Sequence, residues 1–227
     1  MEKVEFVVKK ESPYKFVFNL EHEEEEPDLD AQNEWLAENA QELAPRVAAI
    51  REQLASLPFE AAPSVHIKEG LKRASVKCFI DPDFPPINSS LYDLSEDYPF
   101  SQAVHWRRPK EFMKGKISLF ESGIDPFDVI QGDLKNAWLM AALVGMAENP
   151  KLIERLFVSK KYNEQGFYKI RICVNGEWSV VVVDDYIPCQ INGGPIFTRG
   201  NGNELWVMLI EKAYAKAFGN YNALEGG

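Results

Sequence analysis

The sequence predicts an α+β fold with a central buried helix, a helical cluster and a small antiparallel β-sheet. The segment 136–149 is apolar around most of its circumference, which is typical of a helix at the centre of a core. The segments 167–174 and 178–183 are predicted strands, because Asn175-Gly176 between them is the favoured type I′ hairpin turn. Further helices are expected over 150–158 and over 203–218, with Gly219 in a position that commonly ends helices.

Length and composition place the chain among ordinary globular proteins. It has 227 residues, of which 45% are apolar and 26% charged, so collagen-like, disordered and disulfide-scaffold classes are excluded. No apolar run approaches the roughly 20 residues needed to cross a bilayer, and no transmembrane segment is expected. The first six residues lack the order of a signal peptide. Three cysteines cannot form a disulfide framework, which favours an intracellular, reducing location.

The negative charge is concentrated in one region. Residues 21–60 carry 12 acidic side chains against Arg46 and Arg51, which accounts for the whole net charge of −10. The remainder of the chain is close to neutral and offers no basic face that would neutralise phosphates. Nucleic-acid binding is therefore not expected.

Residues 1–77 are predicted to form an N-terminal extension. Alternating apolar residues over 3–20, interrupted by Ser12-Pro13, indicate a β-hairpin. The tract 21–30 holds seven acidic residues and is expected to be a solvated linker. Residues 31–57 are predicted to be helical, with a kink or break at Ala44 caused by Pro45. A short polar connector is expected over 64–77.

The helical region 31–57 carries a heptad-like apolar stripe. Its members are Leu36, Ala40, Leu43, Val47, Ile50, Leu54 and Leu57. Such a stripe can seat a partner helix and mediate association. Alternatively it packs on the protein's own core, which is the commoner fate of such a face.

Several short motifs follow one another from Cys78 onward, namely 79–91 (FIDPDFPPINSSL), 106–111 (WRRPKE), 128–132 (DVIQG) before 138–142 (WLMAA), 176–185 (GEW and VVVVDD), 203–216 (NELW and EKAYAK) and 223–227 (ALEGG). In this order they resemble the first half of the protease core of the calpain family, which has the papain-like thiol protease fold. The resemblance covers 78–227, about two thirds of the chain.

The resemblance implies a set of catalytic positions. A thiol protease needs a thiolate at a helix N-terminus, a histidine and a group that orients it. Ala137 stands where the family has its nucleophilic cysteine, and Lys135-Asn136 replaces the usual Gly-Asp before it. Gln131 matches the oxyanion-hole glutamine, and Trp138 matches the tryptophan that follows the nucleophile and contacts substrate.

The chain is therefore expected to be catalytically inactive. No histidine occurs after His105, and the family's histidine and asparagine belong to a second subdomain. One hypothesis is a natural pseudoprotease that binds, scaffolds or regulates protein or peptide partners. The alternative is the N-terminal half of an active intracellular calcium-dependent endopeptidase with an engineered Cys-to-Ala change. The divergence at Lys135-Asn136 favours the first, since an engineered change would alter Ala137 alone.

The resemblance also implies calcium as a cofactor. Gly123 and Asp128 match the loop that supplies ligands, and the second carboxylate position falls on Asn201, which costs one negative charge. In the alternative interpretation Asp128 simply orders its own loop. The family resemblance further implies a cytoplasmic or cytoskeleton-associated protein.

Overall fold

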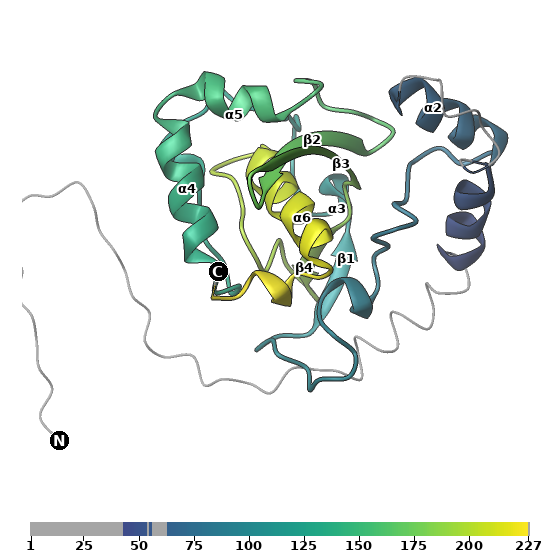
Figure 1. Cartoon of the computed structure of the whole chain (residues 1–227), viewed down its shortest axis with the longest axis horizontal. Coiled ribbons are helices and arrows are strands. Elements are labelled where there is room, and N and C mark those ends of the chain that lie inside the picture. The colour runs from purple at the N-terminus through teal and green to yellow at the C-terminus, as the bar shows by residue number, and fades with distance from the viewer. Residues whose placement is uncertain (1–42, 54, 56–62, 227) are drawn as a thin grey trace, which may run out of the picture.

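The computed structural model describes residues 43–53, 55 and 63–226 (Figure 1). The hairpin predicted over 3–20 and the acidic linker over 21–30 lie outside the described residues. Helices within the described part are 43–53, α2 (Pro63–Arg73), α3 (Pro109–Phe112), α4 (Ala137–Ala147), α5 (Pro150–Leu156) and α6 (Trp206–Phe218). The strands are β1 (Val104–Arg107), β2 (Phe167–Val174), β3 (Glu177–Asp184) and β4 (Ile187–Gln190), and short 3₁₀ turns span Asn88–Ser90, Pro126–Asp128 and Asn222–Leu224. The predicted α+β class is confirmed.

The strands form two small antiparallel sheets. β2 pairs with β3 from Phe167 opposite Asp184 to Val174 opposite Glu177. Asn175 and Gly176 both have positive φ, at 53° and 82°, as a type I′ turn requires, so the hairpin predicted from this dipeptide is confirmed. β1 and β4 form the second sheet, which the sequence analysis did not predict.

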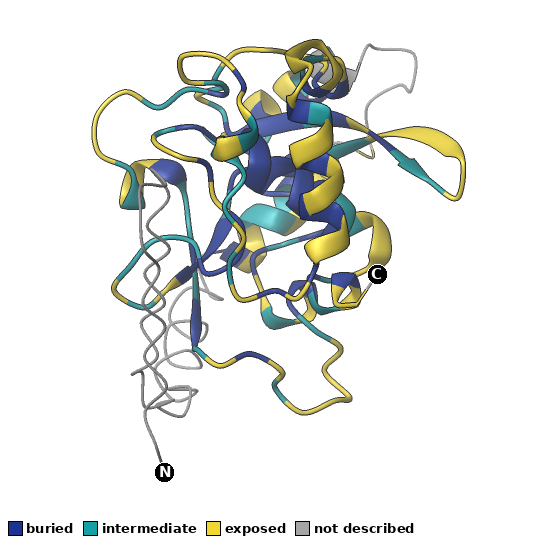
Figure 2. Cartoon of the chain, turned by 90° about the vertical axis from the view of Figure 1, so that its left-hand side faces the viewer, coloured by how far each residue is buried: buried dark blue, intermediate teal, exposed yellow. Residues whose placement is uncertain are grey.

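The central helix of the described structure is α6. It lies between the sheets and α4 in Figure 1, and Trp206 through Ala213 are all buried. The sequence analysis assigned this place to α4, and that was wrong in part. α4 buries Leu139, Met140, Leu143 and Ala147, but its other side is exposed (Figure 2). A helix that carries apolar residues on all its sides, as α4 does, is therefore not necessarily buried on all of them.

A second apolar cluster joins the residues before Cys78 to the rest of the chain. Its buried members are Leu43, Ile50, Ile67, Leu71, Phe79, Ile80 and Phe167. The region 64–77, expected to be a polar connector, largely forms α2, because Ile67 and Leu71 lie one turn apart and anchor one face of an otherwise polar helix.

The described part of the apolar stripe lies in the helix 43–53. Leu43, Val47 and Ile50 pack on the protein's own core, as the alternative interpretation of the stripe proposed. Ala44 and Pro45 both lie in the described helix 43–53, and the part of 31–57 before Leu43, which the predicted kink or break would separate from it, lies outside the described residues.

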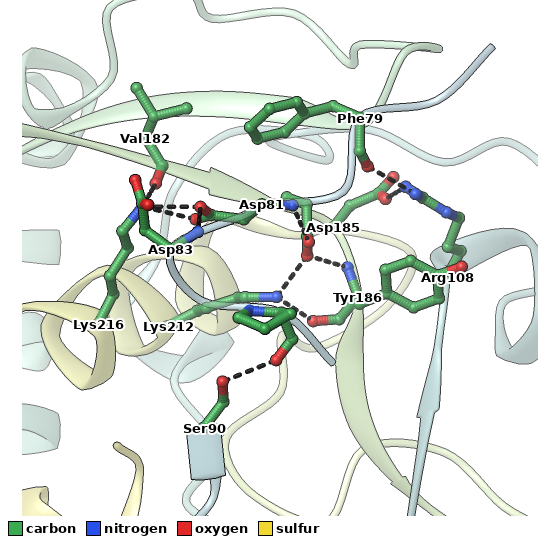
Figure 3. A network of polar contacts seen from close by, with 12 residues as sticks. Phe79, Asp81, Asp83, Ser90, Arg108, Val182, Asp185, Tyr186, Lys212 and Lys216 are labelled. Carbon is green, nitrogen blue, oxygen red and sulfur yellow. Dashed lines mark hydrogen bonds and ion pairs between the residues drawn. The ribbon is translucent and has the colours of Figure 1, made fainter. Parts of the chain in front are cut away.

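Three buried ion pairs tie the start of the core to β3 and α6 (Figure 3). Asp184 pairs with Lys212, Asp81 with Lys216, and Asp185 with Arg108. Lys212 and Asp184 are fully enclosed, with Nζ 2.5 Å from Oδ1. Because a buried charge is strongly unfavourable without a partner, each pair holds its two segments together, and the pair of Asp81 and Lys216 holds the segment around Asp81 against α6.

None of the described helices combines the length and the apolar character that a membrane span requires.

Candidate functional site

The candidate site lies at the N-terminus of α4. Ala137 is the first residue of this helix and is exposed, and Asn136 is its buried N-cap residue. The Asn136 carbonyl accepts hydrogen bonds from the N–H groups of Leu139 and Met140. A helix N-terminus presents free N–H groups and the positive end of the helix dipole, so it suits a side chain or ligand that carries negative charge.

The loop before α4 is held against the segment 196–199. Ile130 exchanges two backbone hydrogen bonds with Arg199, and the N–H of Asp133 donates to the carbonyl of Ile196. Gly132 allows this approach, because a Cβ there would lie 2.0 Å from the carbonyl oxygen of Phe197. The loop that precedes Ala137 is thus placed by backbone contacts that only glycine permits.

Gln131 lies in this loop, as the family resemblance implied. It is exposed, and its Nε2 donates to the carbonyl of Leu134 at 3.3 Å. One of its two amide hydrogens therefore orders the turn that leads into α4.

Asn136 connects the site to the central helix. Its Nδ2 donates to Glu211 Oε1 at 2.7 Å, and Glu211 Oε2 accepts from Thr198 Oγ1 at 2.8 Å and from the Thr198 N–H at 3.2 Å. Burial raises the pKa of Glu211 to about 7, against the opposing effect of these hydrogen bonds. One carboxyl group therefore joins the cap of α4, the 196–199 segment and α6.

Trp138 is half-exposed and follows Ala137 on the same turn. Its Nε1 donates to the carbonyl of Leu224 at 2.9 Å, and its ring packs edge-on against Tyr214. The carbonyl of Lys135 accepts from the Gly226 N–H, so the 222–226 segment also closes on this end of α4. The structure thus brings Gln131, Ala137 and Trp138 to one helix end, with an exposed indole face beside it.

The three predicted calcium residues lie in two loops. Asp128 Oδ2 accepts from the Asp125 N–H at 2.7 Å, so Asp128 does order its own loop. Gly123 has a φ of 118°, which places it in the conformation that favours glycine. The sequence analysis missed Glu204, which lies close to Asp128 and Asn201.

Glu204 is a buried carboxyl group with unused acceptor capacity. Its Oε2 accepts from the Glu121 N–H at 3.3 Å, whereas its Oε1 has no hydrogen-bond partner among the described residues. Burial, followed by the nearby charge of Asp128, raises the pKa of Glu204 to about 7. Within the described ranges no group of three or more His, Cys, Asp or Glu side chains is arranged to hold a metal. A cation here would depend on two carboxyl groups and neighbouring carbonyl oxygens.

None of the three cysteines lies at the N-terminus of α4. Cys189 lies directly opposite His105 across β1 and β4, a neighbour that the sequence did not reveal. However, Cys189 is fully buried, and burial raises the pKa of its thiol to about 12. A neutral, enclosed thiol is a poor nucleophile. Cys78 lies beside the backbone of Glu164, and Cys173 lies within β2, so neither is at α4.

An apolar groove lies elsewhere in the described structure. It has a volume of about 540 Å³ and runs between the helix 43–53 and the segment 85–94. No residue of α4 or of the loop before it lines this groove. It is therefore separate from the helix end at Ala137.

The fold and the helix end together define a fragment of a thiol-protease core. The family model described as "Calpain family cysteine protease" matches residues 79–227. The chain belongs to the calpain family of cysteine proteases. It is 41% identical over 169 residues to the calpain-type cysteine protease DEK1 of Arabidopsis thaliana and 39% identical to the DEK1 of Zea mays, in each case over 71% of this chain.

A rat relative, Calpain-8 of Rattus norvegicus, is 37% identical over 155 residues, which are 66% of this chain. The chain spans only a small part of these relatives. The matched part is 8% of the length of the two plant proteins and 22% of the rat protein.

Proposed function

We propose that this chain is a calpain-family core fragment that binds protein or peptide partners and does not cut them. The observation that carries the proposal is Ala137 at the first position of α4. In a thiol protease the sulfur attacks the scissile carbonyl carbon, the amine leaves, and an acyl-enzyme remains. A methyl group has no electron pair for that attack.

The rest of the helix end supports a binding role. The Gln131 amide, the free N–H groups of α4 and the exposed face of Trp138 are still arranged as a place for an extended peptide with a polarised carbonyl group. Binding needs these groups, whereas cleavage also needs a nucleophile and a base. We also propose a cytoplasmic or cytoskeletal location, which the three unpaired cysteines support.

The variant Ala137→Cys tests the proposal. We expect neither the wild-type chain nor Ala137→Cys to cleave a fluorogenic peptide, because no histidine follows His105 to accept the thiol proton. Alkylation of the new thiol by iodoacetamide, in a Cys78→Ser background, checks that it is exposed and reactive. Cleavage by Ala137→Cys above the rate of Ala137→Ser would overturn the proposal and favour an engineered loss of activity.

We further propose a calcium site at Asp128 and Glu204, with Gly123 and Asn201 contributing oxygen atoms. Asp128 and Glu204 lie close enough for their carboxyl groups to interact, so one cation could contact both. The partnerless Oε1 of Glu204 provides a free ligand atom. Calcium prefers six to eight oxygen ligands, and a bound ion would supply positive charge that fixes the two loops together.

Calorimetric titration with calcium chloride tests this site. We expect measurable binding, weakened at least tenfold by Glu204→Gln and less by Asn201→Ala. Glu177→Gln is the matched control, because Glu177 is exposed beside the β2–β3 turn. Absence of binding heat in the wild-type chain, or equal affinity in Glu204→Gln, would contradict the site.

A further inference from the structure

Three Asn-Gly dipeptides lie on the surface of the described structure. They are Asn175-Gly176, Asn192-Gly193 and Asn201-Gly202, and all three asparagines are exposed. Asparagine is a chemically labile residue. It is most labile before glycine, because glycine has no side chain to hinder the approach of its backbone nitrogen to the asparagine amide carbon. Each dipeptide is therefore a chemical candidate for deamidation, and the backbone around it decides whether the reaction proceeds.

The first two dipeptides are held in turns that oppose the reaction. Asn175 has a φ of 53° in the type I′ turn, and in this left-handed conformation the Gly176 nitrogen points away from the asparagine side chain. The Gly193 N–H donates to the carbonyl of Gln190 at 3.2 Å, so this nitrogen is engaged in a hydrogen bond. Each turn must open before its glycine nitrogen can attack.

Asn201-Gly202 lacks both restraints. Among the residues that the structure describes, none forms a hydrogen bond with the Gly202 N–H or with the side chain of Asn201. Asn201 does not have the positive φ of Asn175. Gly202 itself has a φ of 117°, which residues with a side chain rarely adopt. The backbone that requires glycine at this position therefore also makes Asn201 the most reactive of the three asparagines.

This dipeptide lies beside the Glu204 carboxyl group. A Cβ at Gly200 would lie 3.0 Å from Glu204 Oε1, the oxygen that has no hydrogen-bond partner within the described ranges. The Glu121 N–H donates to Glu204 Oε2 at 3.3 Å, and Glu121 Oε2 accepts from the Asn203 N–H at 2.7 Å. The segment 200–203 is thus held against Glu204, and a charge that arises at residue 201 lies close to this carboxyl group.

We propose that Asn201-Gly202 is a site of spontaneous deamidation, and that the product supplies a third carboxylate to the cation site at Asp128 and Glu204. The Gly202 nitrogen attacks Asn201 Cγ, so that a new N–Cγ bond forms. The Cγ–Nδ2 bond breaks, and the amide nitrogen leaves as ammonia with the proton of the Gly202 N–H. Water then opens the succinimide ring at either carbonyl carbon and leaves aspartate or isoaspartate. Either product carries one more negative charge than asparagine.

The consequence for cation binding rests on the proposed calcium site. In that site Asn201 contributes only a neutral amide oxygen. No group of three His, Cys, Asp or Glu side chains in the described part of the chain is arranged to hold a metal, and a carboxylate at 201 completes such a group. Calcium affinity depends on the number of charged ligands. Deamidation therefore raises the calcium affinity of the chain as the molecule ages.

Peptide mapping by mass spectrometry tests the reaction on the full chain, incubated at mildly alkaline pH. We expect a gain of about 1 Da to appear first in the peptide that contains Asn201, and much later in those with Asn175 and Asn192. In Asn201→Gln this peptide should keep its mass, because glutamine closes a six-membered ring far more slowly. In urea the three sites should react at similar rates, since the turns are then lost. An unchanged Asn201, or faster conversion of either other asparagine in the folded chain, would overturn the proposal.

Calorimetric titration with calcium chloride tests the consequence. We expect Asn201→Asp, and the deamidated chain separated by anion exchange, to bind calcium about tenfold more tightly than the fresh chain. Asn175→Asp is the matched control, because it adds the same charge at the β2–β3 turn and should leave the affinity unchanged. Calcium binding to the fresh chain that deamidation does not strengthen would overturn this inference and leave the calcium site standing. Binding only after conversion would contradict the calcium site of the unmodified chain and support this inference, whereas no binding in either form would overturn both.

Discussion

Asn136 Nδ2 lies 2.7 Å from Glu211 Oε1, and both residues are buried. This hydrogen bond ties the residue just before the helix end at Ala137 to the central helix α6. The other amide atom, Asn136 Oδ1, has no hydrogen-bond partner among the described residues. The position of the candidate site therefore depends on a carboxyl group 75 residues away in the sequence.

The raised pKa of Glu211 predicts a stability that depends on pH. Because the folded pKa is about 7 and the ordinary value is 4.5, the folded state binds more protons than the unfolded state between these values. The free energy of unfolding must then fall as pH rises from about 4.5 to about 7. We expect Glu211→Gln to reduce this fall, because glutamine does not ionise and its amide can donate to Asn136 Oδ1.

Thermal melts of the wild type and Glu211→Gln between pH 5 and pH 8 check this. The melting temperature of the variant relative to the wild type should increase with pH across that range. A difference that stays constant with pH would contradict a titrating Glu211. Glu204 has a similarly raised pKa and the same sign, so part of the pH dependence should remain in the variant.

Local chemistry made some parts of the fold predictable. The β2–β3 turn follows from Asn175 and Gly176, which adopt positive φ at low cost, and α6 ends at Gly219 for the same reason. The partial exposure of α4 was not predictable, because its exposed residues, Trp138 and Val144 among them, are of the types found in a buried helix. α2 was missed because only Ile67 and Leu71 hold it to the core.

The residues of the candidate site were also predictable only in part. Gln131, Ala137 and Trp138 are close in sequence, so their place on one helix end follows from the helix itself. Glu204 and Glu211 come to the site through tertiary packing, which spacing does not reveal. A signal for Glu211 was present, because it is a carboxylate within the apolar run 205–213. Such a residue is buried only when hydrogen bonds or charges satisfy it.

The stability cost of removing Trp138 should be smaller than that of removing a core tryptophan. Trp138 is 37% exposed, whereas Trp206 is fully buried at the start of α6. We expect Trp206→Ala to cost about 3–5 kcal/mol and Trp138→Ala distinctly less. Chemical denaturation of both variants measures this difference. Equal losses would show that Trp138 is as central to the core as the sequence alone suggested.

The enclosed pair of Lys212 and Asp184 predicts a large penalty for removing one partner. Lys212→Met leaves the Asp184 carboxylate buried without its cation, and we expect a loss of about 3–5 kcal/mol. Lys110→Met is the matched control, because its pair with Glu164 is exposed and its loss should change the free energy of unfolding far less. Changing Asp184 to Asn in the Lys212→Met protein should recover part of the loss. Urea denaturation that gave similar losses for Lys212→Met and Lys110→Met would contradict an energetically important buried pair.

Two glycines near the candidate site should respond to alanine in opposite directions. At Gly132 a Cβ would lie 2.0 Å from the carbonyl oxygen of Phe197, so Gly132→Ala must push the loop before Ala137 away from the 196–199 segment. At Gly145, within α4, a Cβ has no atom within 4 Å, and alanine should stabilise the helix by about 0.5–1 kcal/mol. Melting temperatures should therefore fall for Gly132→Ala and rise for Gly145→Ala. A neutral Gly132→Ala would mean that the loop is not held by the close backbone approach described above.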